Sequence, residues 1–516
     1  MHVTTKVVNT VEATQNKRIG IVISGLLLGI LMASMDNTIV STAMGTIVGE
    51  LGGLDKFVWV TSAYMVAEMA GMPIFGKLSD MYGRKKFFIF GILVFMLGSI
   101  LCGTATSIIQ LSLYRAIQGI GGGALVPIAF TIMFDAVPPQ QRGKLGGLFG
   151  AVFGMSSIFG PLLGAYITDY INWHWVFYIN LPLGIIAFLF IAFGYSESHE
   201  HSKQKIDWWG AFTLVGAVVC LMFALELGGK EYAWDSATII ALFVVFAVLT
   251  ILFLLVEKRV EEPIISFAMF TKRLYATSNA TAIFSGAAFI TASVYIPIYI
   301  QGVLGGTATN SGLVLLPMML GSVVTATGGG FLMNKFSYRA IMIPSSVSLV
   351  IGTILLTTLT VTTPRWLVTL YMVVIGLGIG ASFSVLSNAA IHLFDARQRG
   401  SASSTLNFLR SLGMTLGITI FGIIQSHSFL GKLTELMPAG GQIPGGVGDP
   451  HTLLDPAKRA LIPKEVLDMI TQALASSIVS TFNWTIVPAV LALITAIAMS
   501  KEKLDPSSHG AGAGSH

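Results

Sequence analysis

The chain has 516 residues, of which 54% are hydrophobic and 11% charged, and its formal net charge is +5 at pH 7. Soluble domains carry roughly 25% charged residues, so this composition excludes an ordinary soluble protein and indicates a chain that lies in a bilayer. The basic residues form no single patch with interleaved aromatic residues, so we expect no nucleic-acid partner. Cys102 and Cys220 fall within apolar runs and are interpreted as packing residues.

Fourteen apolar runs are long enough to cross the hydrocarbon core of a membrane. Segments of this length satisfy their backbone polar groups in lipid only as helices, so we expect an all-α membrane protein. The runs cover residues 19–43, 57–76, 86–106, 108–133, 144–168, 176–196, 208–228, 237–256, 275–303, 310–333, 340–361, 367–392, 403–425 and 473–500.

The basic residues predict the orientation of these spans, because short loops rich in Lys and Arg stay cytoplasmic. With both termini inside, the cytoplasmic segments hold 21 of the 30 Lys and Arg residues and the short outer loops hold 3. We therefore expect a multi-pass protein of the plasma membrane with both termini cytoplasmic.

Two carboxylates lie within the first two spans, Asp36 about seven residues from the outer end and Glu68 near the middle. A charged side chain at the bilayer centre costs about 2.5 to 3.5 kcal/mol, so both are functional candidates. Arg115 lies about seven residues deep in the fourth span, and it is expected at the depth of Asp36. Our hypothesis is that Glu68 or Asp36 carries a proton, with Arg115 as the electrostatic partner. Fixed structural hydrogen bonds for Asp36 and Arg115 are the alternative.

A charged segment, GKLSDMYGRKK at 76–86, joins the second and third spans. We interpret it as a gating motif whose members are Gly76, Asp80, Gly83, Arg84 and Lys85. The small glycine allows close helix contact, and the charges are expected to break and re-form contacts with neighbouring helix ends.

The fifth span repeats small residues along one face, from glycines at 143, 147, 150 and 154 past Ser157 and Pro161 to Gly164, and its candidate motif is formed by Gly150, Gly154, Gly160, Pro161 and Gly164. Such a stripe permits close backbone contact between helices in a membrane, and proline allows a kink. Tight packing is the simple interpretation. The functional hypothesis adds a dry contact between two halves that discourages proton leak.

Two further charged residues lie within later spans. Glu226 is near the outer end of the seventh span, where a solvated interfacial carboxylate is favoured. Arg410 shares a helical face with Asn407, Gly413 and Gly417, which favours a role in packing and hydrogen bonding. Both are secondary candidates for the site.

The chain repeats itself at low similarity, which predicts two related halves. GFLMNKFSYR at 330–339 is similar to the segment that begins at Gly76, and GLGIGA at 376–381 is similar to GIGGGA at 119–124. Two six-helix halves account for twelve spans and leave an inserted pair. The predicted parts are 1–18, an N-terminal bundle 19–196, the inserted pair 208–256, a C-terminal bundle 275–500 with a long outer loop 426–472, and a cytoplasmic tail 501–516.

Several of these motifs resemble one family of transporters. Residues 76–86 are similar to the loop between the second and third spans of the major facilitator superfamily. DNTIV at 36–40, GPLLGA at 160–165 and WHWVFYINLPLG at 173–184 resemble its fourteen-span drug:proton antiporter branch, with His174 in place of the usual arginine. The resemblance covers nearly the whole chain and implies the major facilitator fold, with two six-helix bundles plus two inserted helices.

The resemblance implies a proton-coupled multidrug efflux antiporter that exports amphipathic or cationic compounds by alternating access, a function linked to antibiotic resistance. We expect no cofactor, with the proton gradient as energy source, and we expect small amphipathic substrates, protons and membrane lipids as partners of a monomer. The alternative is an exporter or flippase for a specific endogenous lipid, peptide or metabolite. ATP-driven transport is disfavoured, because the sequence has no P-loop. A membrane enzyme is disfavoured, because candidate nucleophiles have no obvious partner in the sequence and the His residues show no metal-ligand spacing.

Overall fold

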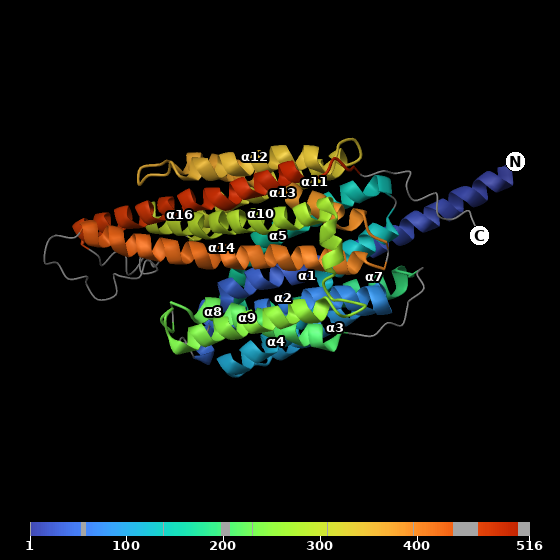
Figure 1. The fold of residues 1–516 in the computed structure, drawn as a ribbon, viewed down its shortest axis with the longest axis horizontal. Helices are drawn as coiled ribbons and strands as arrows, with labels where there is room; N and C mark the ends of the chain where they lie inside the picture. The colour runs from blue at the N-terminus through green and yellow to red at the C-terminus, as the bar shows by residue number, and fades with distance from the viewer. Residues whose placement is uncertain are drawn as a thin grey trace. The chain divides into compact units, whose positions relative to one another are not determined.

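Helices make up the regular structure of the chain in a computed structural model, which describes residues 2–52, 58–137, 139–197, 207–229, 231–306, 308–395, 397–436 and 463–503 (Figure 1). The first helices are α1 (His2–Leu51), α2 (Val58–Tyr82), α3 (Arg84–Gly103), α4 (Ile108–Ala136), α5 (Pro139–Tyr170), α6 (Trp175–Tyr178), α7 (Asn180–Gly194), α8 (Trp208–Leu227) and α9 (Ala237–Glu257). Those that follow are η1 (Phe267–Thr271), α10 (Arg273–Ile298), η2 (Tyr299–Val303), α11 (Ala308–Leu332), α12 (Tyr338–Leu356), α13 (Arg365–His392), α14 (Arg399–Leu436) and α16 (Lys464–Ala498).

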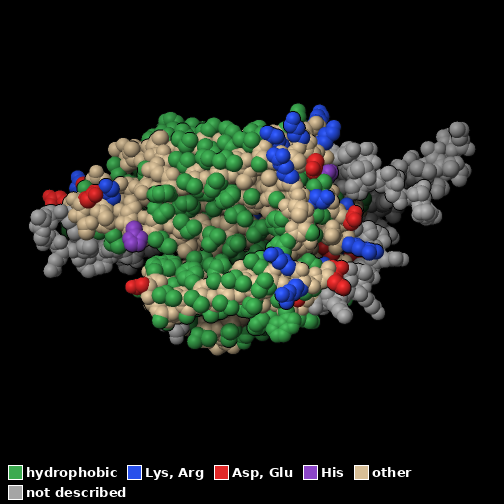
Figure 2. All heavy atoms as spheres, in the orientation of Figure 1, with side chains coloured by type: hydrophobic (Ala, Val, Ile, Leu, Met, Phe, Trp, Pro, Cys, Tyr) green, Lys and Arg blue, Asp and Glu red, His purple; other side chains and the backbone are tan. Residues whose placement is uncertain are grey.

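Thirteen helices in the described part of the chain are long and apolar enough to cross a membrane. The sequence predicts fourteen, and the expected second span, 57–76, corresponds to α2, which is outside this group. α2 nevertheless forms as a helix of 25 residues, and its charged residues Glu68, Lys77 and Asp80 lower its mean hydropathy. Apolar side chains cover most of the surface between the helix ends on the face drawn in Figure 2. The prediction of an all-helical membrane fold is confirmed.

The chain forms two compact units. Unit 1 comprises Met1–Ala276, Ser387–Phe408 and Leu504–His516, and unit 2 comprises Thr277–Leu386 and Leu409–Lys503. Unit 1 therefore includes the first turns of α14 together with the N-terminal helices and the inserted pair α8 and α9. The predicted boundaries of the two six-helix bundles remain predictions.

Local signals in the sequence set the ends of several helices. Gly83 separates α2 from α3 with a φ of 114°, a conformation that favours glycine. The Ser107 hydroxyl caps α4 by accepting a hydrogen bond from the Gln110 amide, and Asp207 caps α8 in the same way. These caps satisfy backbone amides that have no partner within the helix.

Glycines allow α4 to pack closely against α2, next to Tyr64 and Glu68. A methyl group at Gly119 would overlap the Tyr64 carbonyl, and one at Gly123 would lie 2.6 Å from the Glu68 carbonyl oxygen. Only glycine allows this backbone contact. Tyr64 and Glu68 are therefore held next to α4.

The predicted outer loop, 426–472, is helical at both of its ends. α14 continues to Leu436 and α16 begins at Lys464, while residues 437–462 lie outside the described part. The extension of α14 is stable because Phe429 and Leu433, one turn apart on the same face, are both buried. The predicted tail also lies outside the described residues from position 504 onward, as do the side chains of residues 1–18.

Candidate functional site

A buried ion pair joins α1 to α4 in unit 1. The Arg115 guanidinium Nη1 contacts Asp36 Oδ2, and both side chains are fully buried. The shared depth that the sequence predicts for these two residues is thus present in the structure. Inside an apolar helical unit such a pair is retained only when further hydrogen bonds satisfy both partners.

Amide side chains from α4 and α7 supply those hydrogen bonds. Gln118 Nε2 and Asn180 Nδ2 each donate to Asp36 Oδ1 at 2.8 Å, and Gln118 Nε2 also donates to Ser99 Oγ at 2.8 Å. We call these five residues, Asp36, Ser99, Arg115, Gln118 and Asn180, the central cluster. The central cluster joins α1, α3, α4 and α7, and both carboxylate oxygens of Asp36 accept hydrogen bonds within it.

Arg115 makes further contacts that fix its orientation. Its Nε donates to the Val60 carbonyl at 3.3 Å, and its Nη2 donates to Asn37 Oδ1 at 3.1 Å. Its guanidinium carbon lies 4.2 Å from the centroid of the Tyr64 ring, which is a cation–π contact. The charge of Arg115 is therefore held by one carboxylate, neutral acceptors and an aromatic face.

Glu68 differs from Asp36 in having no fixed partner. Its side chain is half-buried on α2, one turn after Tyr64, and forms no hydrogen bond or ion pair with the residues that the structure describes. It lies within electrostatic range of Arg115 and Asp36. Glu68 is consequently a carboxylate that can change its protonation without breaking a bond.

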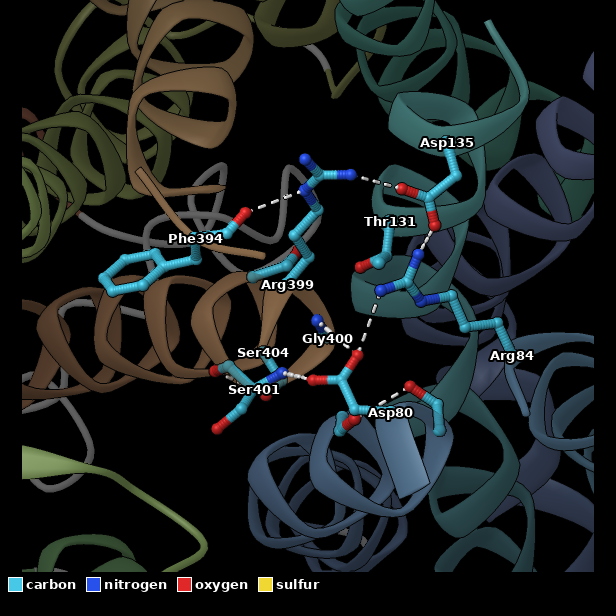
Figure 3. Close-up of polar contacts among 12 residues, drawn as sticks. Asp80, Arg84, Thr131, Asp135, Phe394, Arg399, Gly400, Ser401 and Ser404 are labelled. Atoms are coloured by element: carbon cyan, nitrogen blue, oxygen red, sulfur yellow. Dashed lines mark hydrogen bonds and ion pairs between the residues drawn. The ribbon is translucent and has the colours of Figure 1, made fainter. Parts of the chain in front are cut away.

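A second charged cluster lies where α2, α3, α4 and α14 end or begin, within unit 1 (Figure 3). Arg84 Nη2 lies 3.1 Å from Asp80 Oδ1, and Arg84 Nη1 contacts Asp135 Oδ2. Arg399 Nη1 lies 2.8 Å from Asp135 Oδ1. We call Asp80, Arg84, Asp135 and Arg399 the end cluster, in which two carboxylates and two guanidiniums alternate.

Backbone amides of α14 complete the end cluster. The Gly400 amide donates to Asp80 Oδ1 and the Ser401 amide donates to Asp80 Oδ2, each at 2.8 Å. These amides belong to the first turn of α14, where the helix dipole favours a negative charge. Asp80 therefore caps α14 from a position about 320 residues earlier in the chain.

The remaining members of the predicted gating motif have distinct structural roles. A methyl group at Gly76 would overlap the Ser404 side chain, so glycine allows α2 and α14 to meet. Gly83 supplies the turn before α3, and Lys85 Nζ donates to the Ala192 carbonyl at 2.7 Å. Lys77, within the same motif, forms an ion pair with Glu262 at 2.5 Å.

Asp80 lies beyond the expected span 57–76, at the end of α2. Burial raises its pKa to about 6, although the charge of Arg84 and the amides of Ser401 and Gly400 act to lower it. The carboxylate is therefore poised to gain a proton under mildly acidic conditions.

The glycine stripe of α5 packs on α1. A methyl group at Gly160 would overlap Thr38 Oγ1, and one at Gly164 would overlap Thr42 Oγ1. Thr38 Oγ1 also donates to the Ser156 carbonyl at 3.1 Å. This contact lies within unit 1, next to Asp36 in sequence. A role in preventing proton leak, for these glycines together with Gly150, Gly154 and Pro161, remains a prediction.

The two secondary candidates occupy different surroundings. Glu226 is half-buried in the last turn of α8. Arg410 is buried in α14, where its Nη2 donates to the Ser382 carbonyl at 3.0 Å and its guanidinium lies 5.1 Å from the Phe383 ring centroid. These contacts agree with the packing and hydrogen-bonding role that the sequence favours for Arg410.

An apolar cavity of about 700 Å³ lies in unit 1 between α2, α4 and the inserted helix α8. The rings of Trp59 and Phe223 pack edge to face in its lining, with their centroids 4.9 Å apart. The lining also includes Ile109 and Leu113, whose side chains are more than half exposed. None of the described residues that line the cavity is charged, so it suits an apolar group.

Sequence reasoning assigned two of the five residues of the central cluster, Asp36 and Arg115, and two of the four residues of the end cluster, Asp80 and Arg84. Gln118 and Asn180 lie in motifs that were recognised, but their side chains were not assigned to Asp36. Asp135 and Arg399 lie downstream of the repeats 119–124 and 376–381, which continue to FDA at 134–136 and 394–396, and this continued similarity was the available signal. No local pattern indicates that an amide near residue 400 binds Asp80, because that contact depends on the packing of α14.

The fold and the buried charges define a class: a multi-pass, all-helical membrane protein with ion pairs inside and at the ends of its helices. The profile of the Major Facilitator Superfamily matches residues 26–208 and 201–418, so the chain belongs to this superfamily. It is therefore a membrane transporter of small molecules and not an enzyme.

Relatives and a solved structure agree with that assignment. Multidrug resistance protein 3 from Bacillus subtilis (strain 168) is 54% identical over 488 residues, covering 94% of this chain and 95% of that protein. Multidrug transporter protein MdtP from the same organism is 38% identical over 434 residues, covering 84% of this chain and 80% of that protein. The structure of the proton:xylose symporter XylE matches with a TM-score of 0.61 at 13% identity, over 95% of this chain and 99% of that chain, which shows a shared fold.

Proposed function

We propose that this transporter is a proton-coupled antiporter that exports amphipathic and cationic compounds by alternating access. The observation that carries the proposal is its 54% identity to Multidrug resistance protein 3 across nearly the full length of both chains. A second multidrug transporter aligns over most of the chain at 38% identity. Identity at this level supports a common substrate class as well as a common fold.

Glu68 is the carboxylate that we assign to the transported proton. Protonating Asp36 would leave the fully buried Arg115 without its counter-charge, and breaking a buried ion pair costs about 3 to 5 kcal/mol. Protonating Glu68 breaks no hydrogen bond with a described residue. Asp36 then serves as the fixed partner that neutralises Arg115, and the two charges together influence the proton affinity of Glu68.

The end cluster is the part that we assign to gating. Its ion pairs join α2, α3 and α4 to the first turn of α14 through groups that can separate as whole helices move. The basic residues near it support an orientation in which this end and both termini face the cytoplasm of a cell whose plasma membrane holds the protein. Opening of this end would require the contacts of Asp80 and Asp135 with α14 to break.

The membrane gradient is a sufficient energy source without a cofactor. One proton that enters through 100 mV in exchange for a neutral substrate releases about 2.3 kcal/mol, which supports a concentration ratio of roughly fortyfold. Exchange of one proton for a monovalent cation moves no net charge and is driven by the pH gradient alone. We therefore propose one exchange cycle in which a proton enters as a substrate leaves, performed by a single chain in contact with membrane lipids.

The test uses purified protein in liposomes with an imposed pH gradient. A cationic fluorescent dye should move against its gradient while the internal pH changes, and the proton flux should depend on the dye. Glu68→Gln should abolish the dye-dependent proton flux, whereas Glu231→Gln, an exposed loop carboxylate, should leave it unchanged. Full coupled transport by Glu68→Gln would reject the assignment of Glu68, and dye binding with no flux would reject the antiporter.

The apolar cavity between α2, α4 and α8 favours a second candidate, a flippase or exporter for a lipid-like molecule. Its lining includes Ile109 and Leu113, which are exposed on the membrane-spanning helix α4. Fluorescent lipid analogues in the same liposomes distinguish the two candidates. A flippase would move the labelled lipid and not the dye, whereas the multidrug antiporter would move the dye.

A further inference from the structure

Two carboxylates are buried at the ends of the inserted helix pair. Asp207 precedes α8, and its Oδ1 accepts a hydrogen bond from the Gly210 amide at 2.8 Å. Glu257 is the last residue of α9, its Oε1 accepts a hydrogen bond from the Ile264 amide at 3.1 Å, and the Ile265 amide also faces this carboxylate. The two residues are only 7% and 4% exposed, respectively. Neither takes part in the central cluster or the end cluster.

The second oxygen of each carboxylate is buried without a donor. Asp207 Oδ2 and Glu257 Oε2 accept no hydrogen bond within the described residues. The two groups lie beside the same glycine, since a methyl group at Gly210 would overlap Asp207 Oδ2 and lie 3.1 Å from Glu257 Oε1. Two acidic side chains therefore share one buried site.

The charged neighbours do not neutralise this site. Lys77 of α2 is within electrostatic range of Glu257, but its ammonium is bound to Glu262 at 2.5 Å. Lys258, Arg259 and Glu261, next to Glu257 in sequence, are exposed. Among the described residues, no cation forms an ion pair with Asp207 or Glu257.

Two adjacent buried carboxylates that form no ion pair with a described residue cannot both be ionised at low cost, because burial and like charge both disfavour the second charge. The helix dipoles distinguish the two groups. Asp207 lies at the N-terminus of α8, where a negative charge is favoured, and Glu257 lies at the C-terminus of α9, where it is disfavoured. A proton taken up from water would therefore form its O–H bond at Glu257 and leave the single charge on Asp207.

We propose that Asp207 and Glu257 form a proton-binding site of the inserted helix pair, distinct from the central cluster, with the proton on Glu257. The geometry also connects this site to the end cluster. The Ile264 amide binds Glu257, the Ile264 carbonyl accepts a hydrogen bond from Ser401 Oγ at 2.9 Å, and the Ser401 amide binds Asp80. One buried residue thus lies between the proton site and the first turn of α14.

The connection gives the site a function. Loss of the proton places two negative charges beside Gly210 and pushes the segment 258–265 away from α8. Because Ile264 holds Ser401, that displacement weakens the contact of α14 with Asp80. The inserted helices would then make the stability of the end cluster depend on the pH at that side of the membrane.

Infrared spectroscopy of the full-length protein in nanodiscs tests the proton directly through the C=O band of a protonated carboxyl group. Glu257→Gln should remove one titrating band. Asp207→Asn, which keeps the cap of α8, should move its midpoint to lower pH by about one unit or more, because the neighbouring charge is gone. Glu261→Gln, an exposed neighbour, is the matched control and should change nothing. An unaltered set of bands in both Glu257→Gln and Asp207→Asn would overturn the proposal.

Hydrogen exchange of the segment 399–405 tests the connection to the end cluster. In the wild type its protection, corrected for intrinsic exchange, should fall as Glu257 loses its proton. In Glu257→Gln the part of this fall that follows Glu257 should be missing, because glutamine resembles the protonated acid, and only the change that follows Asp80 itself should remain. A pH profile that is the same in Glu257→Gln and in the wild type would reject the connection. Neither readout needs a transported compound, so failure here is distinguishable from failure of the export function.

Discussion

The central cluster and the end cluster both bury arginine beside aspartate, but they bind their charges differently. In the central cluster, every donor to Asp36 is a side chain from residues 115–180. In the end cluster, Asp80 is bound by Arg84 and by two backbone amides of α14. The first arrangement holds one charge in a fixed place. The second joins segments that are distant in sequence, and it can break as a unit when α14 moves.

The comparison also separates two carboxylates that the sequence treats alike. Asp36 is saturated by donors, whereas the half-buried Glu68 has no bound partner among the described residues. Protonating Asp36 would leave the fully buried Arg115 without its counter-charge, whereas protonating Glu68 would break no bond with a described residue. The four predictions below test these distinctions, from the largest expected effect to the smallest.

Replacing Asp36 with asparagine should produce the largest loss of stability. The change leaves the fully buried Arg115 without its counter-charge, which costs about 3 to 5 kcal/mol. Thermal unfolding of the purified variant should show a clear decrease in Tm, and Arg115→Gln in the same chain should recover part of it. Glu68→Gln should leave the Tm close to that of the wild type. An equal decrease in Tm for Asp36→Asn and Glu68→Gln would show that the two carboxylates contribute equally to stability, against the distinction drawn here.

Replacing Arg399 with glutamine should loosen the end cluster and leave the central cluster intact. The variant loses the contact with Asp135, which is worth roughly 1.5 to 3 kcal/mol for a hydrogen bond between charged groups. A cysteine introduced at Ser404, which packs on Gly76, should then react at least about tenfold faster with a thiol reagent. Arg397→Gln, at an exposed arginine two residues earlier, is the control. Equal rates in the two variants would mean that the Arg399 contact does not close this end.

Replacing Gly160 with alanine tests whether packing also positions the helix that bears Asp36. The new methyl group overlaps Thr38 Oγ1, and such overpacking costs about 1 to 3 kcal/mol. Thr38→Ala in the same chain should recover most of the lost Tm. The matched control is Gly45→Ala, because a methyl group at that position of α1 meets nothing within 4 Å. An unchanged Tm in Gly160→Ala would mean that this glycine contact does not constrain α1.

The smallest expected effect is a change in the pH dependence of stability at Asp80. Its pKa is about 6 in the folded chain against 3.8 for an ordinary aspartate, so the folded state holds a proton that the unfolded state releases. This contribution is fully present below pH 3.8 and is lost as the pH rises through about 6. Asp80→Asn should remove that component from a plot of Tm against pH, whereas Asp235→Asn, an exposed loop residue, should keep it. Unchanged slopes in Asp80→Asn would assign the dependence to another group.

The sequence by itself determined the membrane class, the helical content and most of the membrane-spanning segments, because the length and apolar character of a span are local properties. It also identified Asp36, Glu68, Arg115 and the segment 76–86, because charge in an apolar run is rare. The ends of α14 and α16 were less predictable. The C-terminal part of α14 is mostly polar, and its apolar face is narrow, with Phe429 and Leu433 as buried members. A pattern of this kind is difficult to recognise as a helix from the sequence.

Only the tertiary structure decided which of these groups are bound and to what. Asn180 reaches Asp36 because α7 packs on α1, and Ser401 reaches Asp80 because the first turn of α14 joins unit 1. The burial of Asp207 beside Glu257 likewise depends on how α8 and α9 meet at Gly210. A hydrogen bond acts over about 3 Å, whereas its partners here are tens to hundreds of residues apart in the chain. Composition and spacing therefore predict which residues carry charge, and packing decides which of those charges are fixed, breakable or free to bind a proton.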